Sequence, residues 1–201
     1  MEGWAAMTTI FRTVLSLVAI SWMALPSSAM TMTVEGETVV LSGAVVKADC
    51  ADLEALLARA RVTTVVLTNS GGGNADSGYC IGALVRSRGL STVIRGRCAS
   101  SCSRMWLGGV RRSLDGPTSR VGLHGNYDSN GGLQSAAPQK LRNWIPTYAP
   151  DVDKALMEEW IRLPTNKWMM YFYNDRAQLC QGSDCKPVEG RNAHNAGLAT
   201  H

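Results

Sequence analysis

Hydrophobic and polar positions follow two different periods along the first part of the chain. Residues 31–41 are rich in β-branched side chains around a turn-like Glu35-Gly36, which predicts a strand or hairpin. The next run, residues 63–69, reads TTVVLTN and is typical of a short strand buried in a parallel sheet. Between them, apolar side chains recur at i, i+3, i+4 and i+7, which predicts a helix over residues 51–61; they are Leu53, Leu56, Leu57 and Ala60.

The same alternation continues beyond a glycine-rich turn. Residues 75–88 have helical apolar spacing, and Gly78 and Gly82 would let a neighbouring backbone approach closely. Two further strands are predicted over residues 91–96 and 120–125. Strands that alternate with helices predict an α/β core with a mostly parallel sheet and right-handed crossovers.

The C-terminal third is predicted to be helical, because apolar residues fall at a spacing of four around Leu156. Residues 168–173 form an aromatic and methionine-rich run, interpreted as core side chains that pack against the sheet. The last segment, residues 186–201, is polar and contains glycine and asparagine, so we expect it to be poorly ordered. The folded domain would then cover residues 30–185.

The N-terminal segment has the pattern of a secretory signal peptide. Arg12 precedes an apolar run from Val14 to Leu25, and small residues follow it as far as Ala29. The run is shorter than the roughly 20 residues that span a bilayer, which favours cleavage over an uncleaved membrane anchor. We therefore expect residues 1–29 to send the chain to the periplasm or out of the cell. An anchor in the inner membrane, and with it membrane contact, would follow only if the segment stays uncleaved.

Composition and charge narrow the classes of partner. Apolar residues make up 45% of the chain and charged residues 18%, with no low-complexity block, which is typical of a globular domain. The formal net charge is only +4, and the basic residues are scattered rather than gathered in a stripe. Binding to a phosphate backbone needs such a stripe, so we expect no nucleic-acid partner.

The six cysteines are informative because the chain is expected to be exported. An even number of cysteines outside the cytoplasm is usually oxidised to disulfides. Cys180 and Cys185 flank the turn-like QGSD and are the best candidates for a local bridge. A bridge between Cys98 and Cys102 stays open only if Cys98 lies outside the helix, because positions i and i+4 of a regular helix are too far apart. A zinc site would need closer cysteine pairs or a histidine cluster, so no metal is predicted.

Acyl transfer needs a nucleophile, a base and oxyanion donors, and each has a candidate here. Ser100 lies where a helix is expected to begin, so its hydroxyl either projects as a nucleophile or simply caps the helix. His124 ends a predicted strand and is either a general base or a histidine hydrogen-bonded at a sheet edge. The triplet Gly71, Gly72 and Gly73 offers bare amides for an oxyanion or forms only a turn.

The motifs are more specific together than singly. TNSGGG, GRCASSCS and SRVGLHG resemble, in order and spacing, the motifs of the ClpP/crotonase superfamily, and most of all those of exported ClpP-like proteins with a Cys-Ala-Ser-x-Cys corner. The resemblance covers residues 65–125. It implies a ClpP/crotonase-like spiral of ββα units with a mostly parallel sheet and C-terminal helices. Nothing in the sequence calls for a cofactor.

The resemblance also implies roles for single residues. It makes Ser100 the nucleophile and His124 the base. The oxyanion donors would be the amides of Gly72, Gly73 and Ser101.

The chain departs from the family pattern at two places. Gly71 stands where the family has a proline. No aspartate stands where the family has its third catalytic residue, and the candidates for that role are Asn166 and Asp175. Because loss of the acid in such a triad lowers turnover by about 10⁴, we expect slow activity or none.

The sequence therefore predicts an exported serine hydrolase, more specifically a peptidase that acts on a peptide or protein substrate. The alternative is a catalytically inactive ClpP-like binding or scaffold protein, which the missing aspartate would explain. An acyl-CoA enzyme of the crotonase kind ranks last, because export removes the chain from the CoA pool. The family tends to form rings or trimers, so the resemblance also implies a homo-oligomer.

Overall fold

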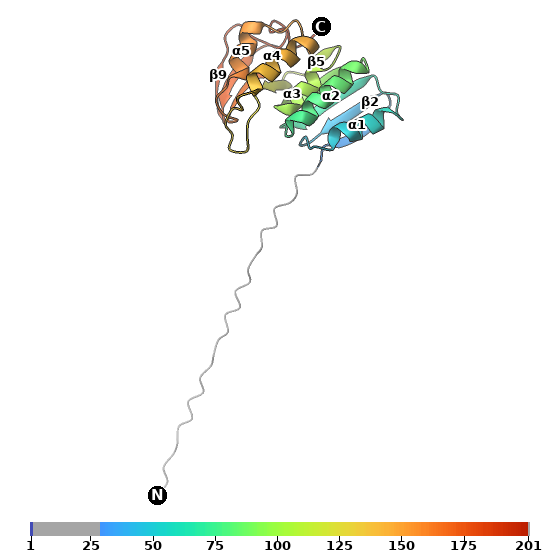
Figure 1. Cartoon of the computed structure of the whole chain (residues 1–201), viewed down its shortest axis with the longest axis horizontal. Coiled ribbons are helices and arrows are strands. Elements are labelled where there is room, and N and C mark those ends of the chain that lie inside the picture. The colour runs from blue at the N-terminus through green and yellow to red at the C-terminus, as the bar shows by residue number, and fades with distance from the viewer. Residues whose placement is uncertain (2–28, 201) are drawn as a thin grey trace.

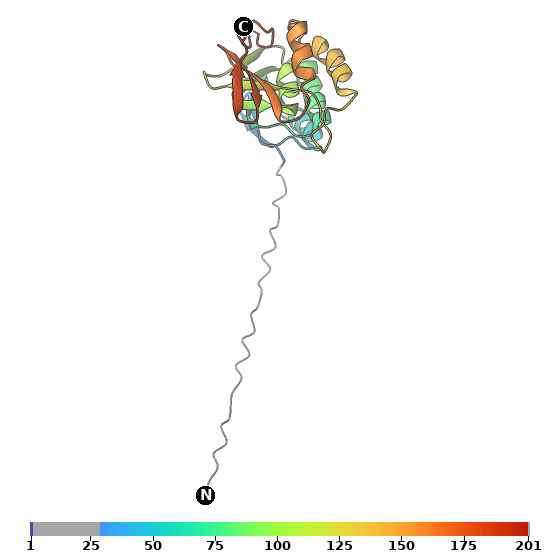
Figure 2. The ribbon, with the colours of Figure 1, turned by 90° about the vertical axis from the view of Figure 1, so that its left-hand side faces the viewer.

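The computed structural model describes Met1 and residues 29–200. The predicted signal segment, residues 1–29, therefore lies almost wholly outside the described residues. Between residues 29 and 200, no helix is long and apolar enough to cross a membrane. Figures 1 and 2 show that these residues form a sheet with helices packed beside it.

A mixed sheet runs through the whole described domain. Its strands lie in the order β1-β2-β3-β4-β6-β7-β8-β9, and β5 pairs with the first part of β4. The central strands β2, β3, β4 and β6 are parallel, whereas β1 and β7 to β9 run antiparallel to their neighbours. The strands are β1 Thr31–Glu35, β2 Thr38–Ser42, β3 Thr64–Ser70, β4 Ser91–Ala99, β5 Arg112–Leu114, β6 Arg120–Leu123, β7 Trp168–Phe172, β8 Ala177–Gln181 and β9 Asp184–Pro187.

Helices connect the parallel strands of the sheet and also lie between β6 and β7. Figure 1 shows α1, α2 and α3 next to one another against the sheet, with α4 and α5 beyond them. Within residues 29–200 the helices are α1 Asp49–Leu57, α2 Ala75–Ser87, α3 Ser101–Leu107, α4 Ala137–Tyr148 and α5 Lys154–Ile161.

The parallel centre of the sheet confirms the predicted α/β fold class. The predicted buried strand is β3, where Val65, Val66 and Leu67 are all at most 5% exposed, as a strand covered on both faces requires. The helices predicted over residues 51–61 and 75–88 correspond to α1 and α2.

Glycines let α2 and α3 approach closely, as the sequence predicts. A Cβ added to Gly78 would lie 2.5 Å from the carbonyl oxygen of Ser101, and one added to Gly82 would collide with the carbonyl oxygen of Arg104. The backbone of α3 therefore rests directly on α2. This contact fixes the position of the helix that follows Ser100.

The C-terminal third differs from its prediction, because only part of it is helical. Residues 154–161 form α5, but residues 168–172 form strand β7, which pairs with β6 and β8. The side chains of β7 alternate, since Met170 and Phe172 are fully buried and Tyr171 is only half-buried. Such a period of two belongs to a strand, and the aromatic run still packs into the core as expected.

The final segment is also more ordered than the sequence suggests. Residues 184–187 form β9, and Ala193, Ala196 and Leu198 are completely buried. Arg112 is buried beneath this segment and donates to the Leu198 carbonyl oxygen at 2.6 Å. These three buried side chains pack the otherwise polar segment against the domain. The folded domain therefore extends past residue 185 to residue 200.

All six cysteines form disulfides, which overturns the zinc alternative. The predicted local bridge Cys180–Cys185 is confirmed, and it joins β8 to β9. Cys98 lies in strand β4, outside α3, and is bridged to Cys102. The third bridge, Cys50–Cys80, joins α1 to α2. Three disulfides are typical of a protein in an oxidising compartment outside the cytoplasm.

The buried C-terminal segment generates a prediction about stability. Leu198→Ala should lower the free energy of unfolding by about 2 to 5 kcal/mol, because it removes a fully buried side chain. Glu189→Ala, an exposed position in the same segment, should change it by less than about 0.5 kcal/mol. Denaturant unfolding of both variants measures the difference. Equal stability of the two variants would show that the segment is not part of the folded core.

Candidate active site

A strained corner between β4 and α3 carries Ser100. Its backbone has φ +57° and ψ −126°, which a residue with a side chain adopts only when its surroundings hold it there. The Ser100 N–H donates to the carbonyl oxygen of Gly122 at 3.0 Å. The Ser100 carbonyl oxygen accepts from the Ser103 hydroxyl at 2.6 Å and from the Arg104 guanidinium at 2.9 Å. These bonds fix the backbone and leave the Ser100 hydroxyl free to point elsewhere.

The Ser100 hydroxyl meets His124. Its Oγ lies 2.7 Å from His124 Nε2, although the two residues are 24 positions apart in the chain. Strands β4 and β6 are parallel neighbours, with Ala99 opposite Gly122, so the residues that follow each strand emerge at the same edge of the sheet. The structure therefore brings together the two side chains that the sequence selects, and Ser100 does not cap α3 with its side chain.

His124 is buried and held neutral. It is 5% exposed, and its pKa is lowered to about 3, mainly because burial disfavours the charged ring and secondly because the positive Arg104 lies nearby. The backbone carbonyl of Trp168 acts in the opposite direction and raises the pKa. Even so, Nδ1 is buried and makes no hydrogen bond of ordinary geometry within the described residues. At neutral pH the ring is therefore uncharged, as a base must be before it accepts a proton.

Arg104 is a site residue that the sequence analysis missed. It is 2% exposed, and it forms no ion pair within residues 29–200. Its guanidinium donates to the carbonyl oxygens of Ser100 and His124, at 2.9 and 2.5 Å, and so ties the two main chains together. The available signal was its position four residues after Ser100, one helical turn along α3.

The backbone of the glycine turn, residues 71–73, packs closely against the corner at Ser100. Gly72 and Gly73 have φ +92° and +147°, and a Cβ on Gly72 would lie 2.6 Å from Ser100 Cβ and 2.9 Å from the Ser101 nitrogen. The Gly72 N–H donates to Ser70 Oγ at 3.3 Å. The N–H groups of Gly73 and Ser101 donate to no other group within residues 29–200. N–H groups without an acceptor, next to a serine hydroxyl, can stabilise the negative charge of an oxyanion.

The two candidates for a third catalytic residue do not reach His124. Asn166 is exposed and its amide packs on Gly131, and Asp175 is exposed and pairs with Arg176 at 2.8 Å. Neither forms a hydrogen bond with His124. In the described part of the chain, the pair of Ser100 and His124 therefore lacks an orienting carboxylate.

A polar pocket lies beside the pair. It has a volume of about 300 Å³ and lies between the glycine turn, the start of α2 and the start of α4. Tyr127 lines it and places its ring 4.7 Å from the His124 ring, measured between centroids. The wall also carries amide and charged side chains: Asn74, Asn126, Gln134, Asp76 and Lys140.

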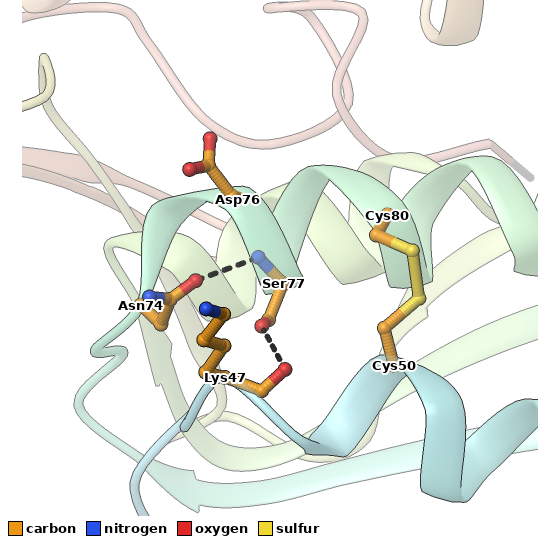
Figure 3. Close-up of a pocket in the computed structure, with 6 residues that line it drawn as sticks. All are labelled: Lys47, Cys50, Asn74, Asp76, Ser77 and Cys80. Carbon is orange, nitrogen blue, oxygen red and sulfur yellow. Dashed lines mark hydrogen bonds between the residues drawn. A yellow bond between two sulfur atoms is a disulfide. The ribbon is translucent and has the colours of Figure 1, made fainter.

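A second pocket lies on the other side of the start of α2 (Figure 3). It has a volume of about 260 Å³ and is bounded by the Cys50–Cys80 bridge and Lys47. The Ser77 hydroxyl donates to the Lys47 carbonyl oxygen at 3.2 Å. Neither Ser100 nor His124 lines this pocket or the polar pocket, but only the polar pocket includes Tyr127, whose ring contacts the His124 ring. Elsewhere in residues 29–200, no group of three or more metal-ligating side chains lies together.

The comparisons with known proteins establish the fold. No family model matches the chain, and no curated protein sequence matches it. Among solved structures, ClpP1 from Listeria monocytogenes is similar with a TM-score of 0.54 and 16% identity, over 82% of this chain and 89% of that one. A serine-to-alanine mutant of 1510-N, a membrane-bound stomatin-specific protease, gives 0.51 and 15%, over 80% and 75%. A protein described as an enoyl-CoA hydratase from Streptomyces coelicolor A3(2) gives 0.52 and 16%, over 92% and 71%.

These similarities show that the chain has the ClpP/crotonase fold, which confirms the resemblance seen in the sequence. The fold includes serine peptidases, and it also includes proteins of the enoyl-CoA hydratase type. Fold alone therefore does not decide between them. The decision depends on the side chains at the β4–α3 corner.

Burial of His124 predicts how stability depends on pH. The folded pKa, about 3, lies below the ordinary value of 6.5, so between these values the unfolded chain binds a proton that the folded chain does not. Stability is then full above pH 6.5 and falls as the pH drops. The loss attributable to His124 between pH 6.5 and 4.5 should be about 2 kcal/mol.

Denaturant unfolding of the wild type and of His124→Gln across this range measures the effect. The difference in free energy of unfolding between the two proteins should shrink as the pH falls. Parallel curves would show that His124 titrates normally and is not held neutral by burial.

Proposed function

We propose that this chain, with its ClpP/crotonase fold, is a serine hydrolase and more specifically a peptidase, with Ser100 as the nucleophile and His124 as the general base. The observation that carries the proposal is the 2.7 Å approach of Ser100 Oγ to His124 Nε2 at a strained strand-to-helix corner. A serine in such a conformation that leaves its helix uncapped and faces a neutral imidazole has the properties of an activated nucleophile.

In the proposed reaction, Ser100 Oγ attacks the carbonyl carbon of the scissile bond while His124 Nε2 takes the hydroxyl proton. The negative charge that develops on the carbonyl oxygen is stabilised by the amides of Gly72, Gly73 and Ser101. For Gly72 this requires its N–H to leave Ser70 Oγ. His124 then gives its proton to the leaving amine, and a water molecule hydrolyses the acyl-enzyme by the same steps in reverse.

The environment of His124 predicts slow turnover. Proton transfer turns the ring into an imidazolium that is buried, has no carboxylate to orient it, and lies near the positive Arg104. Each of these features raises the energy of the charged ring. Loss of the acid in a comparable triad lowers turnover by about 10⁴, so activated reagents should react much faster than peptides.

The polar pocket supports a peptide or protein substrate with a hydrogen-bonding side chain near the scissile bond. Gln134 donates to the Tyr127 carbonyl oxygen and keeps its own carbonyl oxygen unused. Asn74 accepts from the Ser77 N–H and keeps its amide N–H groups unused. A donor and an acceptor together suit a carboxamide, so we propose glutamine or asparagine at this subsite.

The proposed location is the periplasm or the cell exterior, with residues 1–29 as the export signal. The three disulfides support an oxidising compartment. Retention at the inner membrane by an uncleaved N-terminal segment is the alternative. A homo-oligomer, in the manner of related proteins, belongs to the same proposal.

A fluorophosphonate probe tests the nucleophile. The folded wild-type protein should be labelled at Ser100, and Ser100→Ala should not be labelled at all. Ser101→Ala is the matched control, because it removes a neighbouring hydroxyl but keeps the amide at that position. His124→Ala should slow labelling by about 10² to 10⁴. Mass spectrometry of the modified peptide identifies the site.

The second candidate function is a non-catalytic binding protein. It is favoured by one observation, the buried His124 Nδ1 without an ordinary hydrogen-bond partner. If the folded wild type is not labelled, this candidate replaces the hydrolase. Equal labelling of Ser100→Ala would instead assign the reactive nucleophile to another residue.

A peptide library tests the polar subsite. Cleavage by the wild type should be enriched for glutamine and asparagine beside the scissile bond, because a carboxamide offers a donor and an acceptor on separate atoms. Gln134→Leu should remove most of this enrichment without changing fluorophosphonate labelling. Sequencing of the products by mass spectrometry gives the preference, and enrichment of leucine or phenylalanine instead would contradict it.

A further inference from the structure

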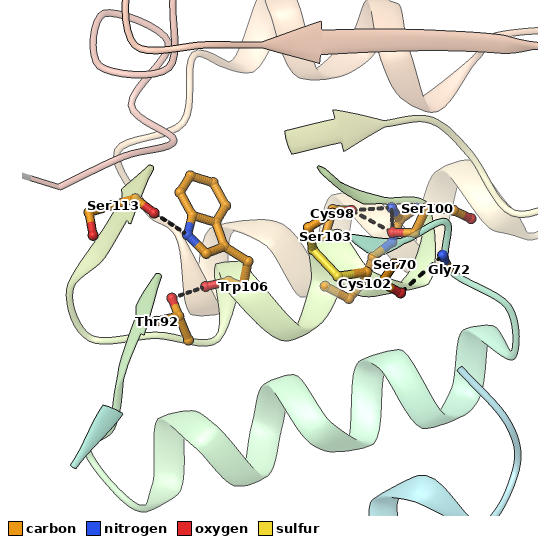
Figure 4. The surroundings of a disulfide bond; sticks show 10 residues. Ser70, Gly72, Thr92, Cys98, Ser100, Cys102, Ser103, Trp106 and Ser113 are labelled. Atoms are coloured by element: carbon orange, nitrogen blue, oxygen red, sulfur yellow. Dashed lines mark hydrogen bonds between the residues drawn. A yellow bond between two sulfur atoms is a disulfide. The ribbon is translucent and has the colours of Figure 1, made fainter. Parts of the chain in front are cut away.

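A disulfide encloses the candidate nucleophile. Cys98 is the second-last residue of strand β4, and Cys102 lies in the first turn of α3 (Figure 4). The bridge between them therefore spans Ser100, and both cysteines are completely buried. Their Cα atoms are 5.3 Å apart. No other covalent link in residues 29–200 crosses the β4–α3 corner.

The bridge adds to the hydrogen bonds that hold Ser100 in an unfavourable conformation. A non-glycine residue at φ +57° and ψ −126° costs about 1 to 3 kcal/mol relative to ordinary backbone. Without restraint, rotation into an extended or helical conformation would relieve this cost. The same rotation would move the hydroxyl away from His124.

The start of α3 also lacks the usual side-chain cap. A serine at this position normally accepts from the first amides of the helix, but the Ser100 hydroxyl meets His124 instead. The helix has only seven residues, too few to be stable alone. Its far end is fixed, since the Thr92 hydroxyl donates to the Trp106 carbonyl oxygen at 2.7 Å. At the near end, the Cys98–Cys102 bridge ties the first turn of α3 covalently to β4.

The bridge is also linked to the glycine turn. Cys98 pairs with Ser70 across β3 and β4, and Ser70 Oγ accepts from the Gly72 N–H. On its other side, Cys102 directly follows Ser101, whose amide is a proposed oxyanion donor. Figure 4 shows the bridge next to Ser70 and Ser100. A change at the bridge would therefore reach both the nucleophile and the proposed oxyanion donors.

From this placement we infer that the Cys98–Cys102 disulfide is a maturation latch: Ser100 becomes reactive only once the two thiols are oxidised. The inference rests on the proposed function of Ser100. Oxidation removes two protons and two electrons from the thiols and forms one S–S bond. The electrons pass to a disulfide of the oxidising compartment, which is reduced to two thiols. A chain that has not yet left a reducing compartment then carries an unreactive serine.

The other two bridges lie elsewhere and supply a control. Cys180–Cys185 joins β8 to β9, and its cysteines are five residues apart against four for Cys98–Cys102. The two bridges close loops of similar length, so the chain-entropy model assigns them similar effects on the unfolded state. Only Cys98–Cys102 spans the corner.

The experiment compares two double variants, Cys98→Ala/Cys102→Ala and Cys180→Ala/Cys185→Ala, with the wild type. Circular dichroism and thermal unfolding establish that each is folded, and the second-order rate of fluorophosphonate labelling at Ser100 is measured. Loss of the corner bridge should slow labelling at least tenfold, and loss of the β8–β9 bridge should change it less than twofold. Equal labelling of the corner variant and the wild type overturns the latch but leaves the proposed function intact.

A second measurement uses the unaltered chain in case the corner variant does not fold. The reduced protein is refolded with glutathione disulfide, and samples are taken over time. The labelling rate should rise in step with the fraction of Cys98–Cys102 found by mass spectrometry. A labelling rate that follows Cys50–Cys80 instead, or that is maximal before any bridge forms, contradicts the latch. Failure of the fully oxidised wild type to label overturns the proposed function, and the latch with it.

Discussion

The candidate site depends on the register between two parallel strands. Ala99 of β4 lies opposite Gly122 of β6, and the Ser100 N–H continues the ladder by donating to the Gly122 carbonyl oxygen. From this register Ser100 and His124 leave the sheet at one edge and meet at 2.7 Å. A shift by one residue would turn either side chain to the opposite face, so the pair exists only in this register.

Next to that pair, the protein buries the positive charge of Arg104. Arg104 ties the Ser100 and His124 main chains together, and its charge adds to burial in lowering the His124 pKa to about 3. The arrangement favours a neutral imidazole before reaction and disfavours the imidazolium that reaction would form. In the proposed reaction, such a weak base predicts slow acylation rather than rapid turnover.

Hydrophobic period predicted the central strands and helices, because it is a local property, and the resemblance to the ClpP/crotonase superfamily selected the Ser100–His124 pair. They did not predict what depends on distant partners. The strand at residues 168–172 is short enough to be taken for part of a helix, and its alternation is clear only against β6 and β8. The seating of Leu198 needs buried Arg112 beneath it. No motif in the sequence points to Arg104. The Cys98–Cys102 bridge could not be predicted without the finding that strand β4 continues through Cys98.

The central claim is that Ser100, His124 and the bare amides of the glycine turn form one reacting centre. A crystal structure of the protein with a phosphonate bound covalently to Ser100 tests it most directly. The account predicts a phosphoryl oxygen within about 3.1 Å of the Gly73 and Ser101 nitrogens, with His124 Nε2 facing the leaving-group side. A phosphoryl oxygen that points into solvent, with those amides turned away, would contradict it.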